Sequence, residues 1–295
     1  MTAPTQTAAA ANSPRPADFG PSDLTLVTGA TGKTGARVAA LLKARGMRVR
    51  AASRSASPAF DWNDPATWDA ALVGVTRVYI SFAPDLAVPG AADIIAAFTA
   101  RAAAQGVERF VLLSGRGEEE AQVCERIVAD AGPDWTVVRC AWFNQNFSEG
   151  PFAEMVHGGV IALPAGEVPE PFVDVDDIAE VAVAALTETG HAGEVYELTG
   201  PRLMSFPEVA AEISAALGRE VAFVQIPRAD FIAGARAAGV DEGMAWLMDY
   251  LFSTVLDGRN AHLADGVERA LGRKARDFGD YARAVAAGPA WKMAG

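Results

Sequence analysis

Three glycines near the start of the chain follow one another at intervals of three residues, directly after a short apolar run. They are Gly29, Gly32 and Gly35. Gly29 can adopt the backbone angles of a sharp turn, Gly32 lets a ligand approach the main chain, and Gly35 lets the following helix pack close to the strand. Unpaired N–H groups at the start of such a helix bind phosphate. The pattern therefore predicts that a dinucleotide diphosphate binds at Gly29, Thr31, Gly32, Lys33, Thr34 and Gly35.

The Gly32-Lys33-Thr34 triplet is also part of the motif of a nucleoside triphosphate loop. That motif requires a glycine five residues before Gly32. The residue at this position is Val27, inside the predicted strand. The dinucleotide interpretation is therefore favoured.

The end of the second predicted strand carries a cation where an NAD-binding site carries an acid for the adenosine ribose. The sequence there reads Ala51-Ala52-Ser53-Arg54-Ser55. The Arg54 guanidinium can bind the 2′-phosphate of NADPH bidentately, while Ser53 and Ser55 add hydrogen bonds and Lys33 adds charge. NADPH is therefore the predicted cofactor. The alternative is that Arg54 is a solvated loop arginine.

Asp61 has two readings of equal weight. Its carboxylate can meet the adenine edge of the cofactor, or it can cap a turn or helix start.

Short β-branched runs alternate with alanine-rich segments from Asp23 to Cys140, which is typical of a Rossmann-type α/β fold with a doubly wound parallel sheet. The predicted strands are Leu24 to Thr28, Arg48 to Ser53, Arg77 to Ser81, Arg109 to Leu113 and Thr136 to Cys140. The predicted helices run near Gly35 to Arg45, Gly90 to Gln105 and Glu119 to Ala131.

The later part of the chain has a more mixed pattern. After a Gly/Pro-rich stretch from Gly158 to Pro171, we predict elements that extend the same sheet or build a smaller cap. They are a helix from Asp176 to Leu186, a strand from Val195 to Leu198, a helix from Phe206 to Leu217 and a strand from Val221 to Ile226. The predicted organisation is a disordered tail (1–22), a dinucleotide-binding domain (23–200, with 147–170 contributing to the substrate cleft) and a mostly helical cap (201–295) that covers the carboxyl edge of the sheet.

The composition disfavours several functions. A formal charge of −12 has the wrong sign for binding nucleic acid. The two cysteines and three histidines are too widely spaced for a structural metal site or a disulfide scaffold. No apolar run reaches the roughly 18 residues of a membrane span, and no signal peptide is evident. We expect a cytoplasmic monomer or homodimer that acts on a small molecule.

The chain resembles the NmrA-like group of atypical short-chain reductases from about residue 24 to 218. The matching stretches, in the family's order, are Leu26 to Gly35, Ala52 to Ser55, Phe60-Asp61-Trp62 with Thr67-Trp68, Arg109 to Ser114, Trp135 to Arg139 with Trp142-Phe143 and Asn146-Phe147, and Phe172 to Ala179. The last 70 or so residues match only loosely.

The resemblance implies a nicotinamide pocket and a substrate pocket beside it. The residues that it places around the nicotinamide are Ser81, Phe82, Ala83, Pro84, Ser114, Gly115 and Arg116, followed by Cys140 and Ala141 beside the ring. Trp142, Phe143 and Phe172 then form an aromatic wall for a flat substrate, which Asn146 orients. The alternative for each aromatic residue is an ordinary place in the core.

The chain lacks the Tyr/Lys pair with which ordinary short-chain dehydrogenases protonate a carbonyl oxygen. The residues four positions after its four tyrosines are Ala83, Gly200, Thr254 and Val285. Without a strong acid, hydride transfer is best suited to an electrophilic acceptor such as a quinone, an iminium ion or an activated alkene. The missing pair fits equally well a non-catalytic sensor of NADP(H).

Other polar groups receive structural interpretations. Glu118, Glu119 and Glu120 are expected to form a solvated helix start. Asp174, Asp176 and Asp177 are expected to cap and pack the following helix. Cys124 is expected to be buried and inert. No catalytic residue is assigned.

Overall fold

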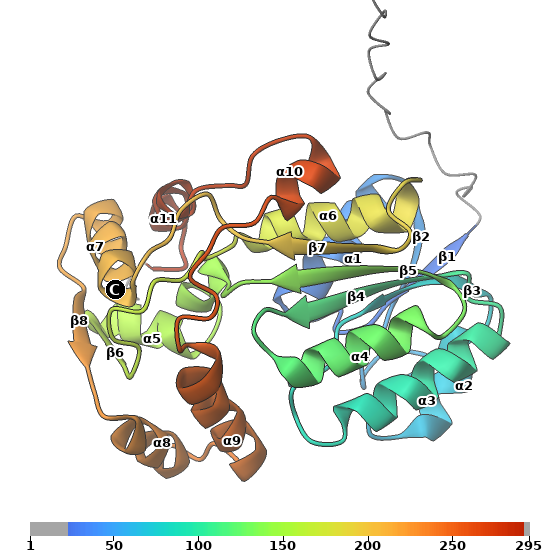
Figure 1. Ribbon diagram of the computed structural model, residues 1–295, viewed down its shortest axis with the longest axis horizontal. Helices are drawn as coiled ribbons and strands as arrows, with labels where there is room; N and C mark the ends of the chain where they lie inside the picture. Colours follow the sequence, from blue (N-terminus) through green and yellow to red (C-terminus); the bar gives the residue numbers. More distant parts are fainter. Residues whose placement is uncertain (1–22, 292–295) are drawn as a thin grey trace, which may run out of the picture.

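Six parallel strands form the main sheet of the computed structural model, which describes residues 23–291 (Figure 1). Their order across the sheet is β2-β1-β3-β4-β5-β7. The strands are β1 (Leu24–Val27), β2 (Arg48–Ala51), β3 (Val75–Ile80), β4 (Arg109–Gly115), β5 (Asp134–Cys140) and β7 (Glu194–Leu198). The fold prediction is confirmed, and the strand from Val195 to Leu198 does extend the sheet.

Helices cover both faces of this sheet, which explains why the central strands are apolar without polar alternation. One core lies between the sheet and α2, α3 and α4, and the other between the sheet and α1, α6 and α10. The helices are α1 (Lys33–Ala44), α2 (Trp68–Leu72, after the 3₁₀ turn Pro65–Thr67), α3 (Ala91–Ala104), α4 (Glu119–Ala129), α6 (Val175–Thr187) and α10 (Gly266–Leu271). Each helix predicted before residue 200 is present, with ends shifted by a few residues.

The strand order creates a crevice at one place on the carboxyl edge. From β1 the chain passes outward to β2 and then crosses back to β3 on the other side of β1. Connections that leave in opposite directions open a space above the carboxyl ends of two neighbouring strands, where open α/β sheets bind their ligands. In this chain the two strands are β1 and β3.

Two buried arginines in the amino-terminal halves of β3 and β4 form hydrogen bonds with the end of α6. Arg77 Nη1 donates to the Leu186 carbonyl at 3.1 Å, and Arg109 Nη1 donates to the carbonyls of Ala185 and Glu188 at 3.1 and 2.8 Å. The last carbonyls of a helix lack partners within the helix, and a cation there is favourable. These contacts fix α6 across β3 and β4.

A second lobe stands at the carboxyl edge of the main sheet, where the arrowheads of β4, β5 and β7 point in Figure 1. Its strands β6 (Val160–Leu163) and β8 (Ala222–Gln225) pair in parallel. Its other elements are α5 (Pro151–Gly158), α7 (Phe206–Leu217), α8 (Arg228–Ala237), α9 (Glu242–Tyr250), a π-helical turn (Leu251–Val255) and α11 (Phe278–Ala287). Strand β6 lies in the Gly/Pro-rich stretch and was not predicted from the sequence.

The core of the second lobe joins segments from both sides of residue 200. It contains Phe147, Ile161 and Phe172 together with Phe206 and Trp291. The division at residue 200 remains a prediction about domains, and the predicted tail lies outside the described residues.

Replacing Gly266 by Ala tests the close packing of α10 against β7. A β-carbon on Gly266 lies 2.2 Å from the Glu197 carbonyl oxygen of β7, so α10 must move outward. We expect a loss of about 1 to 3 kcal/mol in the free energy of unfolding, measured by urea denaturation. Gly234→Ala in α8 is the control, because its β-carbon meets nothing within 4 Å and the change should stabilise the helix by up to about 1 kcal/mol. Equal effects of the two substitutions contradict this account.

Candidate functional site

The glycine turn between β1 and α1 is held by close main-chain contacts. Gly29 has a φ of +59°, and its α-carbon faces Ser81, whose Oγ lies 2.9 Å from a β-carbon built on Gly29. A β-carbon on Gly35 lies 2.3 Å from the Gly29 carbonyl oxygen. Both positions therefore exclude any larger residue, as the spacing predicts.

The start of α1 has the properties of an anion site. Gly32 is the N-cap and is exposed, and it has no side chain that could cap the N–H groups that follow it. The first turn contains no acidic residue. Uncapped N–H groups and the positive end of the helix dipole favour a phosphate, so these residues fit the diphosphate of a dinucleotide.

Hydrogen bonds align the ends of β1 and β3 beneath this turn. Thr28 Oγ1 donates to the Tyr79 carbonyl at 3.0 Å and accepts from Ser81 N at 2.8 Å. Trp62 Nε1 donates to the Ser81 carbonyl at 3.3 Å, and the Trp62 ring packs 5.1 Å from that of Phe82. The segment from Ser81 to Pro84 is thus fixed beside the glycine turn, where the resemblance places the cofactor.

The end of β2 presents Arg54 to solvent. Arg54, like Ser55, is exposed, and the hydroxyl groups of Ser53 and Ser55 lie 3.3 Å apart. Two roles were predicted for Asp61, and the structure shows the one in a turn. Its Oδ1 accepts a hydrogen bond from Asn63 N at 2.9 Å. The proposed contacts of these residues with the cofactor remain predictions.

Lys33 lies on the other side of the turn. Its Nζ is 3.4 Å from a β-carbon built on Gly150, at the start of α5. Burial lowers the pKa of Lys33, while Glu149 opposes this shift. The Lys33 ammonium group therefore lies next to the start of α5 in the second lobe and interacts with Glu149.

The end of β4 holds three of the residues assigned to the nicotinamide pocket. Ser114 is buried and its Oγ donates to Glu125 Oε1 at 2.6 Å. The Arg116 side chain is buried and contacts Glu197 Oε2 at 3.4 Å and His262 Nε2 at 2.8 Å. These two side chains are engaged by the protein itself, and Gly115 offers only its backbone.

One expectation about this region is wrong. Glu118 is 5% exposed and is no part of a solvated turn, although Glu119 and Glu120 are exposed. Its carboxyl group folds back onto Gly115, so that a β-carbon there lies 2.2 Å from Oε1. Burial raises the pKa of Glu118 well above its usual range, and the neighbouring Asp85 carboxyl raises it further.

The end of β5 passes from the main sheet into the second lobe. Cys140 is buried, and burial raises the pKa of its thiol. Ala141 N donates to the Leu198 carbonyl at 3.0 Å. Phe143 pairs with Val173 and packs on the core of the sheet, whereas Trp142 packs on Phe206 and Phe252 in the second lobe. Trp142 and Phe143 therefore face different lobes.

The other two predicted substrate residues differ in exposure. Phe172 is 2% exposed and packs against Phe147, Phe206 and Phe278, which favours the core alternative for this ring. Asn146 is half-buried and follows the same turn as Phe143. Only Trp142, Phe143 and Asn146 of the predicted set keep partly exposed surfaces.

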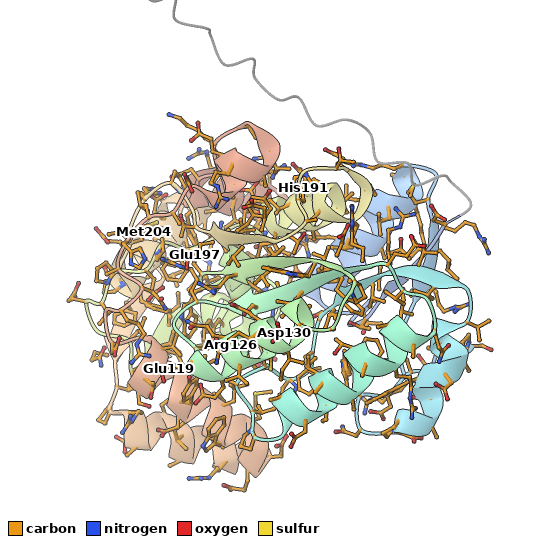
Figure 2. All side chains as sticks on the ribbon, turned by 45° about the vertical axis from the view of Figure 1, so that its right-hand side comes forward. Glu119, Arg126, Asp130, His191, Glu197 and Met204 are labelled. Carbon is orange, nitrogen blue, oxygen red and sulfur yellow. The ribbon has the colours of Figure 1, made fainter. Side chains whose placement is uncertain are left out.

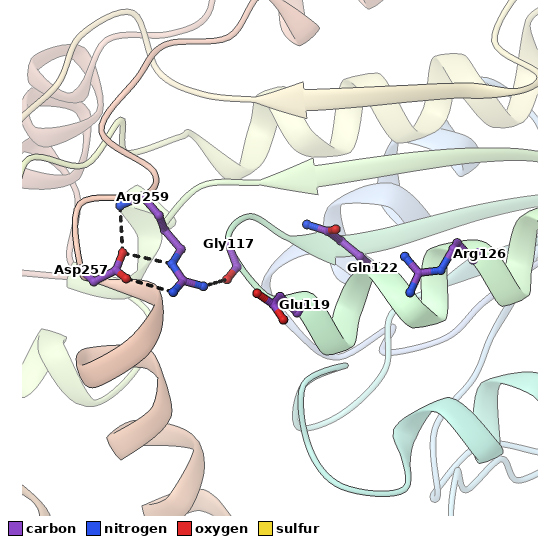
Figure 3. Close-up of a pocket in the computed structure, with 6 residues that line it drawn as sticks. All are labelled: Gly117, Glu119, Gln122, Arg126, Asp257 and Arg259. Atoms are coloured by element: carbon purple, nitrogen blue, oxygen red, sulfur yellow. Dashed lines mark hydrogen bonds and ion pairs between the residues drawn. The ribbon is translucent and has the colours of Figure 1, made fainter.

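A polar cleft of about 630 Å³ opens between the start of α4 and the second lobe (Figure 3). Arg259 spans it by donating to the Gly117 carbonyl at 3.0 Å and by pairing with Asp257. In Figure 2, Glu119 lies at the end of α4 beside the second lobe, and Arg126 and Asp130 lie toward its other end. The cleft is lined by Gly117, Glu119, Gln122, Arg126, Asp257 and Arg259.

Glu170 is a second buried carboxyl group that the sequence analysis missed. It is fully buried, and neither carboxyl oxygen has a hydrogen-bond partner in the part of the chain that the structure describes. Burial raises its pKa to about 7, although Arg116 partly opposes the shift. No local pattern identifies Glu118 or Glu170, since the burial of each depends on segments that are distant in sequence.

The remaining polar interpretations agree with the structure. Asp174 is the N-cap of α6 and accepts from Asp176 N at 2.8 Å. Asp177 is fully buried and pairs with Arg273 and Arg276. Cys124 is fully buried, and burial raises the pKa of its thiol to about 11.

Two features are absent from residues 23–291. No group of three or more His, Cys, Asp or Glu side chains there is arranged to hold a metal ion. No helix in this part of the chain is both long and apolar enough to cross a membrane.

The six-stranded sheet, its crevice and the glycine turn define a Rossmann-type dinucleotide-binding protein. The sequence profile of the NmrA-like family matches residues 21–281, and the chain belongs to this family. It is 34% identical over 286 residues to the NAD(P)H azoreductase of Xenophilus azovorans, covering 89% of this chain and 98% of the relative. It is 30% identical to the agroclavine dehydrogenase of Claviceps fusiformis, covering 87% and 95%. These relatives confirm the prediction of an NAD(P)H-dependent oxidoreductase.

A solved structure shares the fold. The NADPH-dependent quinone oxidoreductase of Escherichia coli, complexed with NADPH, superposes with a TM-score of 0.71 at 23% identity. The match covers 89% of this chain and 99% of the other.

Glu170→Gln tests the buried carboxyl group of the second lobe. The folded protein holds a proton on Glu170 up to a pKa of about 7, above the value in the unfolded chain. Raising the pH from 5 to 8 therefore destabilises the wild type relative to the variant by about 2 to 3 kcal/mol, since each pKa unit corresponds to about 1.4 kcal/mol. Thermal unfolding of both proteins across this range measures the difference. A difference that does not change with pH contradicts the assignment.

Proposed function

We propose that the chain is an NADPH-dependent reductase of an activated small-molecule acceptor, such as a quinone, an azo compound, an iminium ion or an activated alkene. When bound, NADPH supplies the hydride. The observation that carries the proposal is the glycine turn, whose uncapped helix start lies beside Ser81 at the crevice between β1 and β3. The names of relatives that span nearly the whole chain support the choice of reaction.

The chain's own residues divide the task of binding. The N–H groups at the start of α1 bind the diphosphate, and Gly29 and Gly35 keep the turn close to β3. Arg54 binds the 2′-phosphate, because a guanidinium matches phosphate geometry and the end of β2 carries no acid. Trp142 and Asn146, both partly exposed, border the place of the acceptor.

Binding brings the reactants together and excludes water, which by itself lowers the barrier for an electrophilic acceptor. None of the four tyrosines has a lysine four residues later. Tyr79 and Tyr196 are buried, Tyr250 donates to Glu120, and Tyr281 donates to Ser148. The chemistry therefore proceeds without a Tyr/Lys pair.

Mixing the pure protein with NADPH and a panel of quinones, azo dyes and cyclic iminium salts tests this proposal. We expect a decrease in absorbance near 340 nm with at least one acceptor. Saturable binding of NADPH without turnover of any acceptor contradicts the enzyme and supports a sensor of NADP(H) instead.

Arg54→Ala tests the cofactor preference. Loss of the charged hydrogen bonds should weaken NADPH binding by about 1.5 to 3 kcal/mol and leave NADH binding nearly unchanged. Isothermal titration with both cofactors measures this. Arg48→Ala, which removes an exposed arginine from the opposite end of β2, is the matched control. An equal loss for both cofactors contradicts the assignment of Arg54.

A further inference from the structure

Two carboxyl groups meet at the carboxyl edge of the sheet, beside the segments assigned to the nicotinamide. Asp85 follows the Ser81 to Pro84 segment after β3, and Glu118 follows Gly115 and Arg116 after β4. The two side chains are close enough for each carboxyl group to affect the pKa of the other. Each has its pKa raised, mainly by burial. Such a pair retains a proton at neutral pH, since two carboxylates in contact cannot both ionise easily.

The position of Glu118 is fixed by Gly115. Its Oε1, Cδ and Oε2 atoms lie 2.2 to 2.4 Å from a β-carbon built on that glycine, so the carboxyl group occupies the space that a side chain on β4 would fill. Side chains of β4 alternate between the two faces, and Gly115 follows Leu113 on the face that carries α1. Glu118 is thus on the face of the sheet where the glycine turn lies.

A second observation points to a ligand. Glu118 is 5% exposed, and no group among residues 23–291 forms a hydrogen bond with its Oε2. A buried carboxyl oxygen without a partner is costly, and such groups are rare outside functional sites. Asp85 is half-buried and is held by Ala87 N at 2.8 Å, so it connects Glu118 with the exterior.

The charged groups around Glu118 favour its neutral form. On α4, Glu120 and Glu125 add negative charge that raises the pKa of Glu118. From the second lobe, Tyr250 lies near enough for Glu118 to raise the phenol pKa, and its hydroxyl donates to Glu120 at 2.5 Å. On β5, the buried thiol of Cys140 is close enough for Glu118 to contribute to its raised pKa.

Two cations of this region are committed elsewhere. Arg259 donates to the Gly117 carbonyl and pairs with Asp257. Arg116 is two residues from Glu118, but its guanidinium contacts Glu197 and His262. Within residues 23–291, neither guanidinium therefore forms an ion pair with Glu118.

We propose that Glu118 is the proton donor of the reduction and that Asp85 returns the proton to it from solvent. This inference rests on the proposed function and deepens it. Hydride from the reduced cofactor forms one new bond to the acceptor, and the Glu118 O–H bond breaks as its proton passes to the acceptor's nitrogen or oxygen. The acceptor gains two electrons and two hydrogens, the cofactor loses a hydride, and Glu118 is left as a carboxylate until Asp85 reprotonates it.

The proposal divides acceptors by charge. A neutral quinone, azo compound or activated alkene becomes an anion when it gains hydride, and a nearby acid stabilises the transition state. A cationic iminium ion or triarylmethyl dye becomes neutral and requires no proton. Glu118 is therefore needed for the first class and not for the second.

Glu118→Gln tests this division, because glutamine keeps the size of the side chain and removes the acid. We expect kcat to fall about 100-fold or more with a neutral quinone or azo dye, as for loss of a general acid, and to change less than about 3-fold with a cationic iminium salt. Glu119→Gln is the matched control, since it removes an exposed carboxylate from the same helix start. It should leave both rates unchanged.

A readout that is independent of turnover accompanies the kinetics. In the free protein at neutral pH, the infrared band of a protonated carboxyl group should be present in the wild type and in Glu119→Gln and absent or reduced in Glu118→Gln. In the wild type, kcat for the neutral acceptor should fall as the pH rises through the pKa of Glu118 and should be lower in D₂O. The rate for the cationic acceptor should show neither effect.

Each failure has its own signature. Loss of both reactions to the same extent in Glu118→Gln, or no loss of either, overturns the role of Glu118 while the wild type remains an active reductase. Absence of the protonated carboxyl band at neutral pH also overturns it. A wild type that binds NADPH but reduces neither class of acceptor overturns the proposed function itself.

Discussion

The contact between α1 and the end of β1 is the constraint on which the site depends. Because Gly35 has no side chain, α1 can pack tightly against the end of β1. A β-carbon added to Gly35 would lie only 2.3 Å from the Gly29 carbonyl oxygen. The same carbonyl accepts from Gly32 N at 2.9 Å, which closes the turn. The first N–H groups of α1 are thereby held over the crevice between β1 and β3. A larger residue at position 35 would move the start of α1 away from the strand ends. The other segments of the candidate site follow these strand ends.

The elements around this turn could be predicted because their signals are local. Short apolar strands and alanine-rich helices have different periods, and the glycine spacing fixes the first connection. Strand β6 could not be found in this way. Val160–Leu163 is four residues long, follows Gly158 and Gly159, is partly exposed and pairs only with β8, about sixty residues later. Its existence depends on the second lobe and not on its own sequence.

The residues of the candidate site also divide into those with a local sequence signal and those whose position depends on other segments. The positions of Gly29, Gly35 and Arg54 follow from a motif and from a strand end. Glu118 belongs to a run of three glutamates that reads as a solvated helix start, and only its two neighbours satisfy that reading. Its burial requires an empty position on Gly115 and a carboxyl partner on the connection after β3. Neither condition can be read from the residues next to it.

The buried carboxyl groups of Glu118 and Glu170 also differ in what their surroundings allow. Glu170 is fully buried, with its backbone paired to Met204, and within residues 23–291 neither of its carboxyl oxygens has a hydrogen-bond partner. Glu118 has Asp85 as a partner at a half-buried position, which gives its proton a path to solvent. A donor must be neutral before the reaction and must be restored after it. Loss of its proton leaves a negative charge in a site that then also holds an oxidised, positively charged nicotinamide, so the total charge of the site does not change. In a region of low dielectric, a reaction that creates no net charge avoids the cost of burying one, and this is why an acid that forms no ion pair with Arg116 or Arg259 can act there.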